Sequence, residues 1–160
     1  MIFTTKAEYG VRLLVELGRH GVGQPVPLKA LAEGESLPLG YLEHVVALLR
    51  KAELVESTRG ARGGYRLARE PATITMDEVV LALEGSIAPM DCFVGEAESR
   101  ISCSHLDDHG SGCATKYLWT KVQASVVSSL RTTTLADLVL FSAPRDSGRI
   151  QRELTPSLTN

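Results

Sequence analysis

The sequence predicts a mainly α-helical fold with one small β-hairpin. Apolar residues recur at helical spacing over several stretches of the 160-residue chain. Two short strand-like runs flank the glycine-rich segment GARGG at Gly60–Gly64, a pattern typical of a hairpin turn. No apolar run reaches the roughly 18 residues that a membrane helix needs, so we expect no membrane segment.

The first predicted helix covers residues 4–20. Ala7, Val11 and Leu14 fall on one face at helical spacing. Thr5 and Glu8 have the spacing of a capping box, in which each side chain bonds the backbone of the other residue. We therefore expect an amphipathic helix whose start is held by this pair.

Two further helices are expected before the hairpin. A short one is expected at residues 28–34, closed by Gly34. A longer one covers residues 39–52, and its apolar face consists of Leu42, Val45, Val46, Leu49 and Ala52. Its exposed face carries Tyr41, Glu43, His44, Arg50 and Lys51.

Three more helices are predicted after the hairpin. One begins at a Thr75–Glu78 capping box and closes at Gly85. A long helix at residues 114–131 has Leu118, Val122, Val126 and Leu130 in one stripe, and a short helix at TLADLV follows. Because a lone apolar stripe needs a partner, the long helix predicts a homodimer.

These elements divide the chain into four parts. Residues 1–85 form a DNA-binding domain, and residues 86–113 form a polar loop that contains all three cysteines. Residues 114–141 form the dimerisation region, and residues 142–160 form a polar tail that we expect to be flexible. A loop as long as 86–113 is uncommon in a compact domain unless it has a function.

The order helix, short helix, turn, longer helix, hairpin is that of a winged helix-turn-helix. In such a unit the third helix enters the major groove of DNA and the hairpin lies along the backbone or minor groove. The overall charge of −2 gives no nucleic-acid signature, so DNA binding has to come from a local patch. The candidate DNA-binding residues are Tyr41, Glu43, His44, Arg50, Lys51, Arg59 and Arg62.

Several of these candidates have a specific physical reason to contact DNA. Glu43 can accept a hydrogen bond from a cytosine amino group, and His44 can donate to a base or a phosphate. An arginine at the hairpin tip, such as Arg59 or Arg62, suits a narrow A·T-rich minor groove. For every one of them an ordinary solvated surface position is the alternative.

The segment PVPLKALAEGESLPLGYLEHVVALLRKAELVESTRGARGGYRLARE closely resembles the iron–sulfur cluster regulator family of winged-helix transcription factors, the family of IscR, NsrR and RirA. FTTKAEYGVRLL, ITMDEVVLALEG and TTLADLV also look like the family pattern, so the resemblance covers about residues 1–140. It implies a homodimer that pairs through the long helix, and an iron–sulfur cluster held in the cysteine loop of each subunit.

The resemblance implies that Cys92, Cys103 and Cys113 are the thiolate ligands of this cluster. Clusters are held by cysteine thiolates at three or four points. Here ten and nine residues separate neighbouring cysteines, a wider spacing than the family's usual five or so. The cluster type, [2Fe-2S] or [4Fe-4S], therefore stays open.

The fourth ligand is also open. Some relatives have a histidine three residues after the last cysteine, where this chain has Lys116, which cannot act as a normal ligand while protonated. The resemblance points instead to Glu8, donated by the opposite subunit. His105 and His109 are alternatives nearer in sequence, since imidazole is a competent ligand.

The functional expectation is a cytoplasmic, cluster-sensing transcription regulator, a repressor or an activator, that binds a double-stranded DNA operator. The sensed signal is iron, redox state or nitric oxide. The alternative is a winged-helix regulator without a cluster, which either binds zinc or senses thiol oxidation. No catalytic motif stands out and no C-x-x-C pair is present, so we expect no enzyme.

Overall fold

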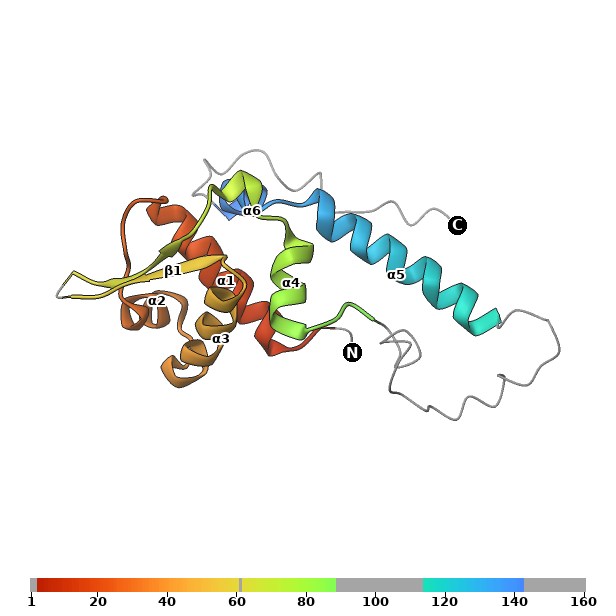
Figure 1. The fold of residues 1–160 in the computed structure, drawn as a ribbon, viewed down its shortest axis with the longest axis horizontal. Coiled ribbons are helices and arrows are strands. Elements are labelled where there is room, and N and C mark those ends of the chain that lie inside the picture. Colours follow the sequence, from red (N-terminus) through yellow and green to blue (C-terminus); the bar gives the residue numbers. More distant parts are fainter. Residues whose placement is uncertain (1–2, 61, 89–113, 143–160) are drawn as a thin grey trace.

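The computed structural model describes residues 3–60, 62–88 and 114–142, and these form a mainly helical fold with one hairpin, as predicted (Figure 1). No helix in these ranges is long and apolar enough to cross a bilayer. The elements in chain order are α1 (Thr5–His20), α2 (Leu28–Glu35), α3 (Leu39–Lys51), β1 (Val55–Thr58), β2 (Gly64–Leu67), the 3₁₀ turn η1 (Pro71–Thr73), α4 (Met76–Glu84), α5 (Ala114–Thr132) and α6 (Leu135–Ser142).

The core lies where α1 meets α2, α3, α4 and the base of the hairpin. Leucines of α1 at positions 13, 14 and 17 are at most 1% exposed and pack against the apolar face of α3. Four of the five predicted α3 residues are buried, namely Leu42, Val45, Val46 and Leu49. Ala52 is exposed, contrary to the prediction, because the helix ends at Lys51 and Ala52 is its cap.

The start of α1 differs from the predicted Thr5–Glu8 capping box. The N-cap is Thr4, whose side chain accepts a hydrogen bond from the Lys6 amide at 3.2 Å. With the cap at Thr4, the third helical position is Ala7, which has no side-chain acceptor to complete a box. Glu8 therefore does not take part in capping α1.

The ends of α2 and α4 show one wrong and one confirmed prediction. Helix α2 runs past Gly34 to Glu35, and Ser36 closes it in the left-handed conformation, with φ 54°. Helix α4 begins at the predicted Thr75–Glu78 box and closes at left-handed Gly85. The ends of α4 were easier to predict than those of α2, because α4 has a capping box at its start and a glycine cap at its end, whereas α2 has no side-chain cap.

The hairpin pairs β1 and β2 antiparallel, with Val55 opposite Leu67 and Thr58 opposite Gly64. The chain before α2 adds to its base, since Val26 and Tyr65 exchange two backbone hydrogen bonds of 2.8 Å. A Cβ atom at Gly64 would lie 2.4 Å from the Val26 carbonyl oxygen. Glycine at this position permits the close approach, which anchors the hairpin to the rest of the domain.

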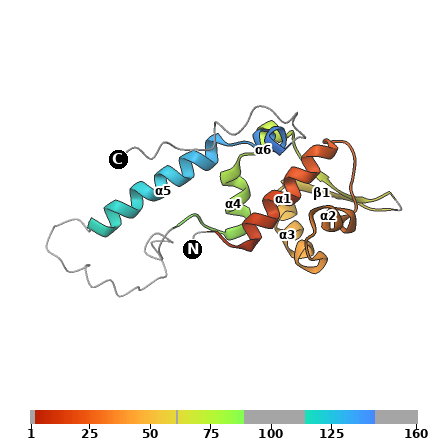
Figure 2. The ribbon, with the colours of Figure 1, turned by 180° about the vertical axis from the view of Figure 1, so that it is seen from behind.

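Helix α5 leaves the compact body and extends to one side as a long rod (Figures 1 and 2). It is joined to α4 at one end, where Arg131 lies 3.2 Å from Asp77. A hydrogen bond from the Thr75 hydroxyl and the nearby Arg131 guanidinium lower the pKa of Asp77, although burial opposes this. No residue of α5 is buried in the single chain, and Leu118 of the predicted apolar stripe is 56% exposed.

Candidate nucleic-acid interface

The N-terminal half of α3 presents polar side chains on the face opposite the core. Glu43 and His44 are exposed, while the neighbouring Leu42 and Val45 are completely buried. Tyr41 is only half-buried, because its ring packs edge to face against Tyr9 of α1. The two exposed side chains are therefore carried on a helix that is locked to the core from behind.

Arg50 and Lys51 are exposed at the opposite end of the same helix. A rise of about 1.5 Å per residue separates Arg50 from Tyr41 by roughly 14 Å along the axis. The Arg50 Nη1 atom lies 3.4 Å from the Ser57 hydroxyl of β1. The five predicted DNA-binding residues on α3 thus separate into an N-terminal group, Tyr41, Glu43 and His44, and a C-terminal group, Arg50 and Lys51, near the base of the hairpin.

The hairpin tip carries Arg59 and Arg62, both of which are exposed. Within the described ranges no carboxylate pairs with either of them. Arg66, in contrast, lies back along the sheet, with Nη2 2.9 Å from Glu56 Oε2. The tip lies at the far end of the molecule from α5 in Figure 1. Because Arg59 and Arg62 are exposed there, an anionic partner can reach them.

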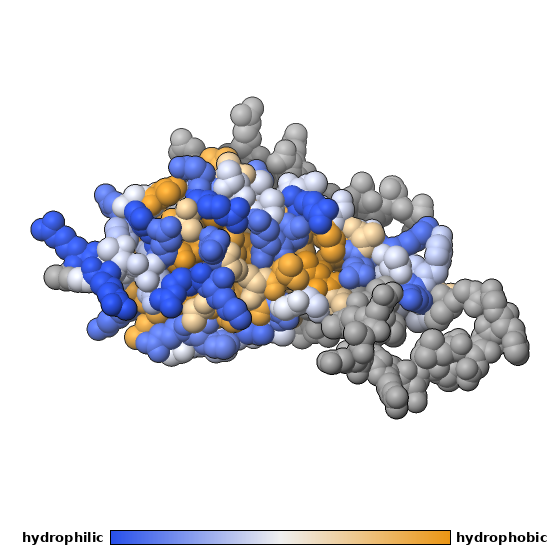
Figure 3. Space-filling view, in the orientation of Figure 1, coloured by the Kyte–Doolittle hydropathy of each residue, from blue (hydrophilic) through white to orange (hydrophobic). Residues whose placement is uncertain are grey.

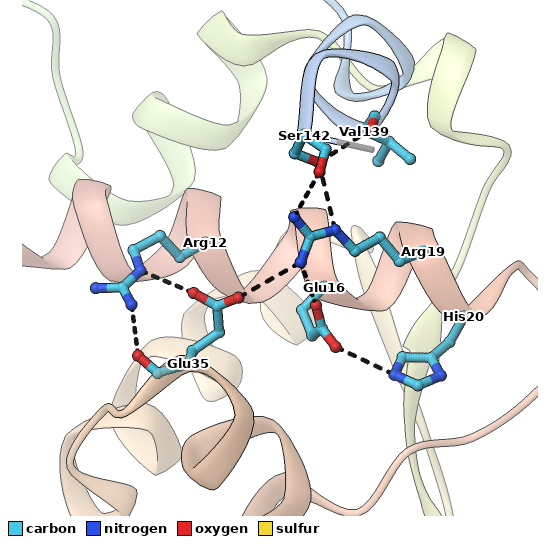
Figure 4. Close-up of polar contacts among 7 residues, drawn as sticks. All are labelled: Arg12, Glu16, Arg19, His20, Glu35, Val139 and Ser142. Atoms are coloured by element: carbon cyan, nitrogen blue, oxygen red, sulfur yellow. Dashed lines mark hydrogen bonds and ion pairs between the residues drawn. The ribbon is translucent and has the colours of Figure 1, made fainter. Parts of the chain in front are cut away.

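A polar network lies behind the turn that leads into α3 (Figure 4). Glu35, the last residue of α2, lies between two arginines of α1, with Arg12 Nε at 2.9 Å and Arg19 Nη1 at 3.9 Å. Arg19 also lies 2.8 Å from Glu16 and donates to the carbonyl oxygen of Ser142 at 3.1 Å. Sequence reasoning missed this network because most of its contacts join different helices, α1 with α2 and α1 with α6.

Glu8 is exposed on α1, with 64% of its side chain accessible and Arg12 Nη1 as its partner at 3.8 Å. It stands at the edge of a largely apolar groove of about 830 Å³ that is lined also by Phe3, Val11, Val80 and Leu130. Figure 3 shows apolar surface over α4 and the adjoining end of α5. The groove and the α5 stripe together leave an apolar face that one chain does not cover.

The other predicted metal ligands, Cys92, Cys103, Cys113 and His105, lie outside the described residues, as does His109. Lys116 lies in the first turn of α5. Among residues 3–60, 62–88 and 114–142, no three His, Cys, Asp or Glu side chains come together as a metal site. Glu8 is thus the one member of the predicted ligand set whose surroundings are defined.

Comparison with known proteins places these features in a family. Residues 3–140 match the Rrf2 family, described as iron-dependent transcriptional regulators. The protein rrf2 of Nitratidesulfovibrio vulgaris is 37% identical over 139 residues, which cover 87% of each chain.

Two solved structures have the same fold. CymR, the global cysteine regulator of B. subtilis, superposes with a TM-score of 0.69 at 36% identity, over 88% of this chain and 97% of that one. IscR of T. potens superposes with a TM-score of 0.67 at 37% identity, over 87% and 86%. These relatives are regulators rather than enzymes, and the winged helix-turn-helix prediction is confirmed. The chain belongs to the Rrf2 family of transcriptional regulators.

Proposed function

We propose that this protein is a homodimeric DNA-binding regulator whose affinity for its operator is controlled by an iron–sulfur cluster that responds to iron, redox state or nitric oxide. The observation that carries the DNA-binding part is the exposure of Glu43 and His44 on α3 together with that of Arg59 and Arg62 at the hairpin tip, which pair with no carboxylate among the described residues. Family membership supports the same conclusion.

In this proposal α3 and the hairpin have separate tasks. Glu43 and His44 approach base edges in the major groove, where a carboxylate or an imidazole can discriminate between bases. Arg59 and Arg62 contact phosphates or the minor groove, and such contacts supply affinity with little sequence information. Arg50 and Lys51 add positive charge at the end of α3, just before the chain enters the hairpin.

The dimer is proposed from the uncovered apolar face. Leu118 and Tyr117 are 56% and 65% exposed on α5, Phe3 is exposed where it lines the groove, and Leu81 is exposed on α4. Large exposed apolar surfaces of this kind mark interaction sites. A second copy that lays its own α5 against this face would cover the stripe of both chains by two-fold symmetry.

The donor set fits an iron–sulfur cluster. Cys92, Cys103 and Cys113 would supply thiolates, and Glu8 of the second subunit would supply a carboxylate, with His105 as the alternative. Glu8 suits this role because it is exposed and its nearest cation, Arg12, is no closer than 3.8 Å. When bound, the cluster would supply iron that gains or loses electrons and reacts with nitric oxide. Release of Glu8 would then change the contacts of α1 beside the DNA-reading unit.

The second candidate is a regulator without a cluster, in which the cysteines sense thiol oxidation or bind zinc. The similarity to CymR, described as a cysteine regulator, favours this reading. The wide cysteine spacing and Lys116 in place of a histidine also favour it. Both candidates share the same DNA-binding surface.

Visible absorption and native mass spectrometry of anaerobically purified protein test the proposal. We expect a dimer with iron-dependent absorption at about 400 nm or above, where iron–sulfur charge transfer gives bands. Glu8→Ala should alter the spectrum, whereas Glu33→Ala, an exposed carboxylate on α2, should not. Colourless protein that takes up no iron on reconstitution would contradict the cluster and leave the thiol or zinc candidate.

A further inference from the structure

We infer that Glu35 is a positioning residue that fixes the angle at which α3 is presented to DNA, because two arginines of α1 hold it at the start of the α2–α3 turn. The inference rests on the DNA-binding part of the proposed function. It involves neither the cysteines nor any residue that we place in contact with DNA, and it meets the proposed cluster ligands only through Arg12, which also lies 3.8 Å from Glu8.

The carboxylate of Glu35 is held from both sides. Its Oε2 atom lies 2.9 Å from Arg12 Nε, and its Oε1 atom lies 3.9 Å from Arg19 Nη1 (Figure 4). Arg12 also donates through Nη2 to the backbone carbonyl oxygen of Glu35. Only 18% of the Glu35 side chain is exposed, so these charges are partly shielded from water and attract one another more strongly than surface pairs do.

The turn that follows transmits this position to α3. It consists of three residues, in which Ser36 is left-handed at φ 54° and Leu37 is 8% exposed. The Leu37 amide donates to the Ala32 carbonyl at 2.8 Å, and Pro38 is the N-cap of α3. A turn this short, with a buried side chain and a fixed proline, has little freedom to absorb a shift of Glu35. Displacement of the end of α2 therefore tilts the start of α3, where Glu43 and His44 lie.

Arg19 connects the same carboxylate to the end of the described chain. Its Nε lies 3.3 Å from the Ser142 hydroxyl, and its Nη2 lies 3.1 Å from the Ser142 carbonyl oxygen. Ser142 is the last residue of α6, which follows α5. One guanidinium group thus joins the α2–α3 turn to the helix that follows α5, and a change in α6 can reach α3 by this route.

The experiment compares specific with non-specific DNA binding. The probe is a duplex selected from a random-sequence pool by the wild-type protein, and the reference is a shuffled duplex of equal length. Glu35→Gln removes the charge but keeps the size of the side chain. Glu33→Gln is the matched control, because Glu33 is on the same helix, is 69% exposed and, among the described residues, has only Lys29 as its ion-pair partner, at 3.9 Å.

We expect Glu35→Gln to lower the ratio of specific to non-specific affinity by about tenfold, the effect of losing roughly one base contact. Arg19→Gln should lower it by about threefold, with non-specific affinity changed no more than the lost charge explains. Glu33→Gln should leave the ratio unchanged. Because Arg19 is 41% exposed, Arg19→Gln decides the question if Glu35→Gln does not fold.

Equal losses of specific and non-specific affinity, or a fall in thermal stability with an unchanged ratio, would overturn the inference, since a merely structural role has that signature. Failure of the wild-type protein to select any duplex would overturn the proposed function as well. That result is obtained before any variant is made, so it is distinguishable from a failure of Glu35 alone.

Discussion

The rings of Tyr9 and Tyr41 meet edge to face, with 5.4 Å between their centroids and 81° between their planes. Tyr9 belongs to α1 and Tyr41 to the first turn of α3, so this pair fixes α3 to the core directly after the α2–α3 turn. The sequence placed Tyr41 among the DNA-contacting residues. Its half-buried position indicates a second role, the support of the helix that reads DNA.

Replacement of Tyr41 separates these two roles. Tyr41→Ala should lower the free energy of unfolding by about 2 kcal/mol, because it removes a half-buried ring and an aromatic pair. Tyr41→Phe should stay within about 0.5 kcal/mol of wild type, measured by urea unfolding. A double-mutant cycle with Tyr9→Ala should give a coupling of about 1 kcal/mol. Unchanged stability of Tyr41→Ala would show that the ring pair holds nothing together.

The hairpin tip is expected to contact phosphates. Arg62→Ala should weaken binding to all duplexes alike and reduce the slope of log affinity against log salt by about one. Fluorescence anisotropy titrations at several salt concentrations measure this slope. Arg66→Ala is the matched control on the same hairpin, because Arg66 is already paired with Glu56 at 2.9 Å. An equal effect of both replacements would mean that overall charge, rather than the tip, governs binding.

Glu84 joins the start of α1 to the end of α4. Its Oε1 atom accepts from the Thr4 amide at 2.9 Å and from the Thr4 hydroxyl at 2.7 Å, and Lys6 Nζ lies 3.9 Å from Oε2. Burial by itself raises the pKa of Glu84, but these hydrogen bonds and the Lys6 charge outweigh it, so the pKa lies below the usual value of 4.5. The stabilising contribution is therefore complete above pH 4.5 and is lost as the pH falls through the lowered pKa.

Glu84→Gln should lower the free energy of unfolding by about 1–2 kcal/mol at neutral pH, because Thr4 and Lys6 lose a charged partner. The difference from wild type should shrink as the pH is lowered below 4.5, since protonated Glu84 resembles glutamine. Urea unfolding at several pH values between about 3 and 7, which bracket the ordinary pKa values of carboxyl groups, measures both effects. A difference that stays constant over this range would refute the charge-based explanation.

Local patterns predicted most of the fold. The buried face of α3 follows from the 3.6-residue period, and the Thr75–Glu78 box and Gly85 marked both ends of α4. The start of α1 was wrong by one residue because Thr4 and Thr5 are equally good caps in isolation. Glu84, a residue 80 positions away, bonds Thr4 and so decides between them.

The candidate interface was predictable in part. Glu43, His44, Arg59 and Arg62 are exposed, as a DNA-binding role requires, because their exposure follows from the helix period and the hairpin pattern. The contacts of Glu35 with Arg12 and Arg19 were not predictable, since they depend on how α1 crosses α2. Pairing between distant segments leaves no trace in local spacing, and this limits what one sequence can reveal about how α3 is supported.

Close packing of α1 against α6 depends on Gly18. A Cβ atom there would lie 2.6 Å from Val139 Cγ2, a branched side chain with few rotamers, whereas a Cβ atom at Gly34 of α2 meets nothing within 4 Å. Alanine is the better helix former by about 1 kcal/mol, so the surroundings decide the sign of each replacement.

Gly34→Ala should therefore stabilise the protein by about 0.5 kcal/mol, less than the full propensity gain because the position is near the helix end. Gly18→Ala should destabilise it by about 1 kcal/mol, since the cost of overpacking exceeds the gain in helix propensity. Thermal and urea unfolding of the two variants side by side measure the difference. If Gly18→Ala were as stabilising as Gly34→Ala, α6 would be free to move away from α1, and Arg19 could not hold Ser142 and Glu35 at fixed positions.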